Sequence, residues 1–253
     1  MLSFSEVTIG YNGTHSMNIP DVVLPESGIV CILGKNGAGK TTLFKTLTAD
    51  ISVLSGTILV DNKSISSYNI SALAKKMCYI PQSINVGANI RAITWVLMGG
   101  AHSIGMFSNP TRGALEAAEY AMSLVGISSM KERDLSTLSG GELRKVALAR
   151  ALYQDSSIVL LDELFGPLDI YSTLQVRELL QEAALNRLIV LTTHDIQMVM
   201  KTADYVVLMC SNGEAKVAKP GDIDQDMLAS VYGIQFSSMV EKVSTVGKDW
   251  VIY

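Results

Sequence analysis

A glycine-rich loop near the start of the chain has the residue types and spacing needed to hold nucleotide phosphates. Gly34 and Gly39 are separated by four residues, and Lys40 and Thr41 follow directly. Glycine lets successive backbone N–H groups turn towards phosphate oxygens without a clash from a side chain. We therefore expect Lys40 to reach the β- and γ-phosphates of a nucleotide and the Thr41 hydroxyl to bind Mg²⁺.

The segments on either side separate this interpretation from an ordinary glycine-rich turn that contains a chance lysine. Gly28–Leu33 is apolar and rich in β-branched residues, which is typical of a buried parallel strand. Thr41–Thr48 has the pattern of a helix start. A helix that begins at the loop adds a partial positive charge where the phosphates would bind. A strand before the loop and a helix after it favour phosphate binding.

Two carboxylates follow a second apolar run. Ile158–Leu161 leads directly into Asp162 and Glu163. The acid that ends the strand beside a phosphate loop holds Mg²⁺, usually through water, and Asp162 fits that role. Glu163 is the next residue, points in a different direction and fits a general base for the attacking water. The alternative is a pair of exposed acids after a strand, and the phosphate loop favours the chemical interpretation.

A third motif lies between these two and predicts a second anion site. Ser139 and Glu142 have the spacing of a capping box at a helix N-terminus. Gly140 and Gly141 leave the first N–H groups of that helix uncovered, which is typical of an anion site. One nucleotide does not need two phosphate sites on separate subdomains. We therefore expect the Ser139 loop of each chain to face the ATP of a second copy, with a plain helix cap as the alternative.

The composition narrows the classes of function. The chain has 253 residues, of which 48% are hydrophobic and 17% charged, and its net charge of −4 gives no indication of a nucleic-acid partner. The three cysteines are widely spaced, so we expect neither a disulfide framework nor a metal site from them. The first residues lack a secretory pattern, and no apolar run approaches the roughly 20 residues of a spanning helix. We expect a separate subunit to hold the protein at any membrane where it works.

The periodicity predicts an α/β fold: a nucleotide-binding core with a helical insertion, followed by a C-terminal tail. Further strands are expected at Thr57–Val60, Met77–Ile80, Ile158–Leu161, Leu188–Thr192 and Tyr205–Met209. Apolar residues three and four apart predict helices within Ile90–Met98, Ala114–Val125 and Leu143–Leu152.

This pattern divides the chain into three expected parts. Residues 1–82 and 156–210 form the core, residues 83–155 form the helical subdomain, and residues 211–253 form a C-terminal extension packed on the core. Within the extension, Tyr232-Gly233 and Trp250–Tyr253 are expected to add small strands.

The ordered set of motifs resembles the nucleotide-binding subunit of ATP-binding cassette (ABC) transporters over nearly the whole chain. Gly34–Thr42 resembles the Walker A loop, Ile158–Glu163 the Walker B strand and Leu138–Glu142 the signature motif. The resemblance implies a P-loop nucleotide-hydrolase core, in which helices flank a RecA-like sheet, together with an N-terminal antiparallel β part and a helical insertion. It also implies that ATP is hydrolysed with Mg²⁺ at sites shared between two chains in a head-to-tail dimer. The implied nucleotide-binding residues of these motifs are Gly34, Asn36, Gly37, Ala38, Gly39, Lys40, Thr41, Thr42, Ser139, Gly140, Gly141 and Glu142.

Four further residues match shorter motifs of the family. Gln82 resembles the Q-loop glutamine, which contacts Mg²⁺ and the attacking water, and His194 resembles the switch histidine that holds the γ-phosphate. Asp169 resembles the D-loop aspartate at the dimer seam, and Tyr11 the aromatic residue that stacks on adenine. The alternatives are a structural histidine at position 194 and a surface turn around Tyr11.

The chain departs from the family pattern at two places. Leu164 and Phe165 follow the glutamate where proline is usual, and Pro167 replaces a small residue. We expect altered packing of that loop, with activity retained.

The segment after Gln82 indicates the type of transporter. Val96–His102 and Phe107–Pro110 are similar to importers of iron–siderophores, haem, cobalamin and some oxyanions, although Gly100 replaces the usual arginine. Leu228–Gly233 also resembles that group.

The resemblance implies integral membrane permease subunits as partners, an extracytoplasmic solute-binding protein as an indirect partner, and a location on the cytoplasmic face of the cell membrane. One alternative is a soluble ABC ATPase outside transport, such as the type that serves iron–sulfur cluster assembly. Another is a P-loop kinase or GTPase, which would have no use for Leu138–Glu142.

Overall fold

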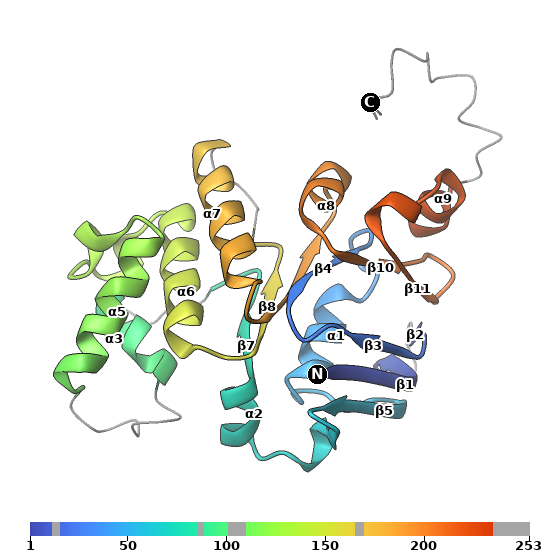
Figure 1. Cartoon of the computed structure of the whole chain (residues 1–253), viewed down its shortest axis with the longest axis horizontal. Coiled ribbons are helices and arrows are strands. Elements are labelled where there is room, and N and C mark those ends of the chain that lie inside the picture. The colour runs from blue at the N-terminus through green and yellow to red at the C-terminus, as the bar shows by residue number, and fades with distance from the viewer. Residues whose placement is uncertain (12–15, 85–88, 101–109, 165–169, 235–253) are drawn as a thin grey trace.

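The computed structural model describes residues 1–11, 16–84, 89–100, 110–164 and 170–234, with side chains for all of these except residues 170–172 (Figure 1). Figure 1 shows β1, β2, β3 and β5 at one end of the molecule and α3, α5 and α6 at the other, with β4, β7 and β8 between them. Among the described residues, none of the helices combines the length and the apolar character required to cross a lipid bilayer.

A six-stranded sheet brings the predicted motifs to one edge. The strand order is β11-β10-β4-β9-β8-β7, and all neighbouring pairs are parallel except β10 and β11. Its strands are β4 (Gly28–Leu33), β7 (Met77–Ile80), β8 (Ile158–Asp162), β9 (Leu188–Thr193), β10 (Tyr205–Met209) and β11 (Ala215–Ala218). Parallel strands end at the same edge of a sheet, so the loops after β4, β7, β8 and β9 meet there. Five of the six strands expected in the core lie in this sheet and are confirmed, and the sixth, Thr57–Val60, lies in the second sheet.

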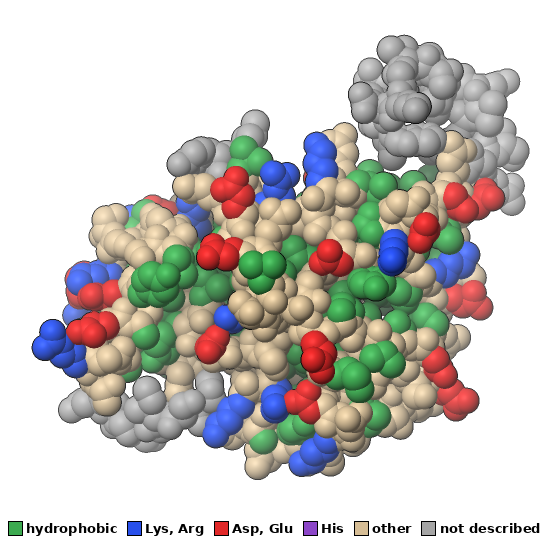
Figure 2. All heavy atoms as spheres, viewed as in Figure 1, with side chains coloured by type: hydrophobic (Ala, Val, Ile, Leu, Met, Phe, Trp, Pro, Cys, Tyr) green, Lys and Arg blue, Asp and Glu red, His purple; other side chains and the backbone are tan. Residues whose placement is uncertain are grey.

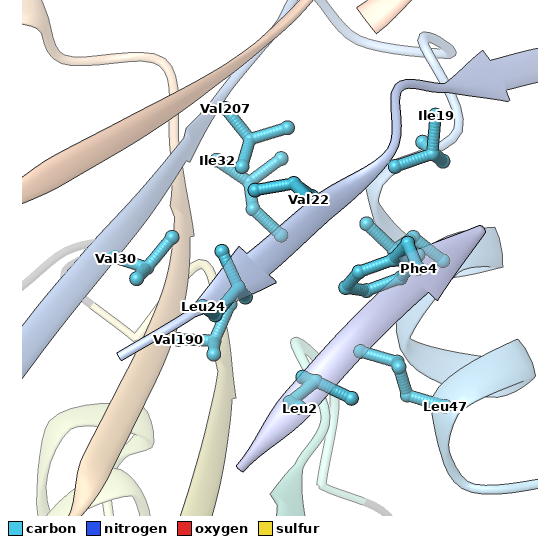
Figure 3. A pocket seen from close by; sticks show the side chains of 11 residues that line it. Leu2, Phe4, Ile19, Val22, Leu24, Val30, Ile32, Leu47, Val190 and Val207 are labelled. Atoms are coloured by element: carbon cyan, nitrogen blue, oxygen red, sulfur yellow. The ribbon is translucent and has the colours of Figure 1, made fainter. Parts of the chain in front are cut away.

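A second, antiparallel sheet covers part of this core and confirms the N-terminal β part. It runs in the order β2-β1-β5-β6, and β3 also pairs with β1. Its strands are β1 (Leu2–Gly10), β2 (Ser16–Ile19), β3 (Val22–Leu24), β5 (Ser55–Val60) and β6 (Lys63–Ser64). The two sheets and α1 enclose a small apolar cavity, lined from both sheets by residues such as Phe4, Ile32 and Val190 (Figure 3).

The helices agree with the predicted periodicity. They are α1 (Lys40–Leu47), α2 (Ile70–Lys76), α3 (Ala92–Leu97), α5 (Arg112–Leu124), α6 (Gly140–Gln154), α7 (Ile170–Ala183), α8 (Ile196–Thr202) and α9 (Gln225–Tyr232). Short 3₁₀ turns connect them: η1 (Ile65–Ser67), η2 (Met98–Gly100), η3 (Ser128–Met130), η4 (Leu135–Thr137) and η5 (Pro220–Asp222). Within residues 83–155, α3, α5 and α6 pack on one another, so the expected helical segments are confirmed; the division into domains stays a prediction.

The tail differs from the expectation at Tyr232-Gly233, where a strand was predicted. Tyr232 is instead the last residue of α9, and Gly233 ends the helix with a left-handed φ of 68°. Asp224 caps the helix start, with the Met227 N–H donating to Asp224 Oδ1 over 2.7 Å. Apolar residues of α9 at helical spacing pack against the larger hydrophobic core, which includes residues of the parallel sheet and of α3, α5 and α6. Val231 of α9 is fully buried. This amphipathic face outweighs the β-propensity of Val231 and Tyr232. Trp250–Tyr253 lies outside the described residues.

The surface carries charges of both signs. On the face drawn in Figure 2, basic and acidic side chains are interspersed among apolar and polar ones. This mixture fits a net charge of only −4.

Gly99 and Gly100 allow η2 to lie directly against α6. A Cβ on Gly99 would come within 2.9 Å of the Arg150 carbonyl oxygen, and a Cβ on Gly100 within 2.9 Å of the Tyr153 ring. The ring of Tyr153 therefore takes space that a larger residue at position 100 would need. This contact gives a physical reason why glycine stands there in place of the family's arginine.

We predict that Gly99→Ala destabilises the fold by about 1–3 kcal/mol, because the new methyl group meets a backbone oxygen that cannot move alone. Chemical denaturation measures the change. Gly113→Ala is the matched control: Gly113 lies in α5, and a Cβ there meets nothing within 4 Å. Equal stability of the two variants would contradict the close packing of η2 on α6.

Candidate active site

A polar cleft at the carboxyl edge of the parallel sheet brings together residues from three of the predicted motifs. Its lining residues are Asn36, Gly37, Gly39, Lys40, Thr41, Thr42, Gln82 and Glu163. Gly37 and Gly39 have left-handed φ values of 80° and 99°, which L side chains rarely adopt. These two glycines turn the loop after β4 into the first turn of α1. Gly34 and Ala38 belong to the same loop, so the cleft contains the predicted phosphate-binding segment.

Lys40 is held within this loop and faces a carboxylate. Its side chain is only 6% exposed, and its Nζ donates to the carbonyl oxygens of Gly34 over 2.7 Å and Lys35 over 3.2 Å. The same Nζ lies 3.4 Å from Glu163 Oε1. The structure therefore places one buried ammonium group where an anion that enters the cleft would meet it.

Asp162 is a buried carboxylate that accepts hydrogen bonds from three hydroxyl groups. It is 1% exposed. Thr41 Oγ1 and the Tyr79 hydroxyl donate to its Oδ2 over 2.7 and 3.2 Å, and Thr192 Oγ1 donates to its Oδ1 over 2.6 Å. Burial, and secondarily the charge of Asp162, raises the pKa of Tyr79, which keeps that hydroxyl protonated as a donor.

The donor set around Asp162 fits a magnesium ion. Mg²⁺ prefers oxygen ligands and is usually held by one or two carboxylates together with phosphates and water. The Asp162 carboxylate and the Thr41 hydroxyl, which lie 2.7 Å apart beside the phosphate loop, supply oxygen ligands of that kind. Thr41 and Asp162 are the residues that would hold the ion, and Gln82 lies on the same cleft.

Glu163 points into the cleft, away from the buried site of Asp162. Its backbone is left-handed, with φ of 48°, and its N–H donates to Thr192 Oγ1 over 2.9 Å. Gln82 Nε2 donates to Glu163 Oε2 over 2.6 Å, while Lys40 lies near the other carboxylate oxygen. The prediction that the two neighbouring acids point differently is confirmed.

The Ser139 motif forms the predicted capping box at the start of α6. Ser139 Oγ accepts from the Glu142 N–H over 3.3 Å, and Glu142 Oε2 accepts from the Ser139 N–H over 2.7 Å. Hydrogen bonds from Ser139, with a smaller effect of Arg133, lower the pKa of the Glu142 carboxyl. Ser139 and Gly140 are exposed, and the described lining of the cleft contains no residue of this motif.

Among the residues described, His194 and Tyr11 do not line the cleft. His194 is exposed directly after β9, where Thr193 Oγ1 accepts the Asp195 N–H over 3.0 Å and shapes the turn. Tyr11 follows β1 and is 49% exposed. Asp169 lies outside the described residues.

Sequence reasoning missed Tyr79 and Thr192. Tyr79 lies near the carboxyl end of β7, three residues before Gln82. Thr192 lies near the carboxyl end of β9, two residues before His194. Their polar side chains in otherwise apolar strands are the signal that could have identified them.

The loop after Glu163 departs from the family pattern, as noted above. Leu164 is 3% exposed and packs in the large core, which accounts for an apolar residue at that position. Phe165 and Pro167 lie outside the described residues.

Comparisons with known proteins agree with this fold. A family model described as "ABC transporter" matches residues 18–166. The chain is 27% identical to the petrobactin import ATP-binding protein FpuD of Bacillus anthracis, over 92% of this chain and 87% of the relative. It is 28% identical to the manganese transport system ATP-binding protein MntB of Bacillus subtilis, over 97% of this chain and 98% of the relative.

A solved structure shares the fold. It is described as an inward-facing conformation of a putative metal-chelate type ABC transporter, with a TM-score of 0.79 and 24% identity, covering 92% of this chain and 88% of that one. At this identity the likeness supports the fold only. The match to the family model, which spans more than half of the chain, shows that this protein belongs to the ABC transporter family, as an ATP-binding subunit that hydrolyses ATP.

Proposed function

We propose that this chain hydrolyses Mg-ATP at two composite sites in a head-to-tail homodimer, with Glu163 as the general base. The observation that carries this proposal is the cleft in which the Glu163 carboxylate lies 3.4 Å from Lys40, beside the bonded pair Thr41 and Asp162. A base must lie within reach of the water whose proton it takes, and Glu163 is the carboxylate on the cleft wall.

Each predicted residue takes a part in this proposal. Lys40 and the backbone N–H groups of residues 34–42 bind the phosphates, and Gln82 and His194 orient the attacking water and the γ-phosphate. Ser139 and the N–H groups at the start of α6 bind the γ-phosphate held by the partner chain. Tyr11 stacks on adenine, and Asp169 lies at the dimer seam. Mg²⁺ bound at Thr41, Gln82 and Asp162 supplies charge neutralisation of the β- and γ-phosphate oxygens.

The contacts of Glu163 give a reason why this base would work only after substrate binds. Both carboxylate oxygens of Glu163 are engaged, one near Lys40 and one by Gln82. A γ-phosphate competes for the Lys40 ammonium, because that phosphate carries more negative charge than a carboxylate. Glu163 is then free to accept a proton from water, whose oxygen attacks the γ-phosphorus as the bond to ADP breaks.

We further propose that this ATPase drives an importer with large membrane subunits, of the type II group that takes up iron–siderophores, haem, cobalamin or related metal complexes. The similarity to the ATP-binding protein of a petrobactin importer supports this substrate class, while the similarity to that of a manganese transport system leaves the free metal ion as a second candidate. The chain would act on the cytoplasmic face of the membrane, bound to permease subunits and served by an extracytoplasmic solute-binding protein.

We predict that Glu163→Gln binds ATP but lowers kcat by about 10²-fold or more, because the amide cannot accept the water's proton. The variant should accumulate as an ATP-bound dimer in size-exclusion chromatography. Glu26→Gln is the matched control, since Glu26 is exposed and precedes β4 at the opposite edge of the sheet. Turnover of Glu163→Gln at the control's rate would rule out Glu163 as the base.

We predict that Ser139→Arg abolishes hydrolysis but leaves ATP binding intact, since the defect acts on the partner's nucleotide. Mixing Ser139→Arg subunits with Lys40→Met subunits, each inactive alone, should restore ATPase activity, because one site of each heterodimer is then intact. Absence of recovery contradicts the shared-site proposal. Thr111→Arg controls for the loss of a helix cap, because Thr111 caps α5 through the Ala114 N–H in the same way.

The importer assignment is tested by purifying the tagged protein from gently solubilised membranes and identifying its partners. We expect a polytopic permease, whose associated solute-binding protein is then tested with ferric siderophores, haem and Mn²⁺. A stable complex with soluble proteins and no permease would contradict the importer and favour an ABC ATPase outside transport.

A further inference from the structure

Thr192 lies between the two carboxylates that follow one another at the end of β8. It occupies the carboxyl end of β9 and pairs with Asp162 in the parallel register of the two strands. Thr192 is 1% exposed. Its hydroxyl group contacts both acidic residues: Oγ1 donates to Asp162 Oδ1 over 2.6 Å and accepts from the Glu163 N–H over 2.9 Å.

The two bonds use the hydroxyl group in complementary ways. A threonine hydroxyl has one proton to give and can accept at its lone pairs. The proton goes to Oδ1 of Asp162, and a lone pair receives the backbone N–H of Glu163. Because the same oxygen joins both groups, the position of the Asp162 side chain and that of the Glu163 backbone depend on each other.

The backbone at Glu163 needs such support. A residue other than glycine rarely adopts a left-handed conformation, and Glu163 does so with φ of 48°. This turn directly follows the last residue of β8, and the Glu163 side chain lies in the cleft, where it contacts Gln82 and Lys40. Strained backbone of this kind persists only where surrounding contacts hold it.

We propose that Thr192 is a positioning residue for ATP hydrolysis: its hydroxyl fixes the orientation of Asp162 and the backbone turn that directs Glu163 to the attacking water. Thr192 touches neither substrate nor metal and acts through these two neighbours. The inference rests on the roles proposed above for Asp162 and Glu163.

Replacement of the hydroxyl by a methyl group separates positioning from packing. Valine has nearly the shape of threonine but makes neither bond, so Thr192→Val leaves a buried N–H and a carboxylate oxygen without their partner. Small misplacements of catalytic groups cost up to about 10²-fold in rate, so we expect kcat to fall about 10- to 100-fold. ATP affinity should stay within about threefold, because Lys40 and the glycine-rich loop are unchanged.

The experiment measures kcat and the ATP dissociation constant for wild type, Thr192→Val, Thr192→Ser and Thr202→Val. Thr192→Ser keeps the hydroxyl and should recover most of the wild-type kcat. Thr202→Val is the matched control: Thr202 ends α8, is 7% exposed, and its Oγ1 has no hydrogen-bond partner among the described residues. A kcat of Thr192→Val equal to that of Thr202→Val would overturn the proposal, as would a parallel loss of ATP affinity.

A second pair of variants and a measurement of Glu163→Gln complete the experiment. If Thr192→Val fails to fold, Thr192→Ala is compared with Thr192→Ser, which differs from it by the hydroxyl alone; equal kcat values for the two overturn the proposal. Glu163→Gln is measured alongside. If that variant hydrolyses ATP normally, the proposed catalytic base is wrong. If it is inactive while Thr192→Val is unaffected, only the role of Thr192 is wrong.

Discussion

A carboxylate buried away from water requires hydrogen-bond donors, and the site of this ATPase is organised around that requirement at Asp162. The hydroxyl groups of Thr41, Tyr79 and Thr192 supply those donors. They come from α1, β7 and β9, so three elements far apart in the sequence must be in place before the carboxylate is stable. The Asp162 carboxylate therefore links three segments: the glycine-rich loop with the start of α1, the strand before Gln82 and the strand before His194.

The hydrogen bonds around Asp162 also accompany a difference in position between Asp162 and Glu163. β8 carries Asp162 into the interior, where it is 1% exposed, and the left-handed turn at the next residue directs Glu163 into the cleft. In the cleft, Lys40 and Gln82 hold the Glu163 carboxylate at its two oxygens. Lys40 and Gln82, which are proposed to contact ATP and its attacking water, thus restrain the proposed base until the γ-phosphate replaces the Glu163 carboxylate at Lys40. The capping box at Ser139 is exposed, as the proposed contact with the nucleotide of a second chain requires.

Local patterns predicted much of this structure. Three features each depend on a few consecutive residues: the glycine-rich loop, the apolar strand that ends at Asp162 and the Ser139–Glu142 capping box. The structure contains the loop on the cleft, the strand as β8 and the capping box at the start of α6. The contacts of Tyr79 and Thr192 with Asp162 depend on strand register between distant segments, which single-sequence periodicity does not contain. The C-terminal α9 was missed for a related reason: its apolar residues suit either a strand or a helix, and the core surface on which they pack selects the helix.

The most direct test of this account is a crystal structure of the full chain with Mg²⁺ and a non-hydrolysable ATP analogue. We predict a head-to-tail dimer in which the analogue's γ-phosphate contacts Lys40 and the partner's Ser139 loop. We also predict that the Glu163 carboxylate has left Lys40, while Thr192 still bonds Asp162 and the Glu163 N–H. A nucleotide bound within one chain alone, with Glu163 still against Lys40, would contradict it.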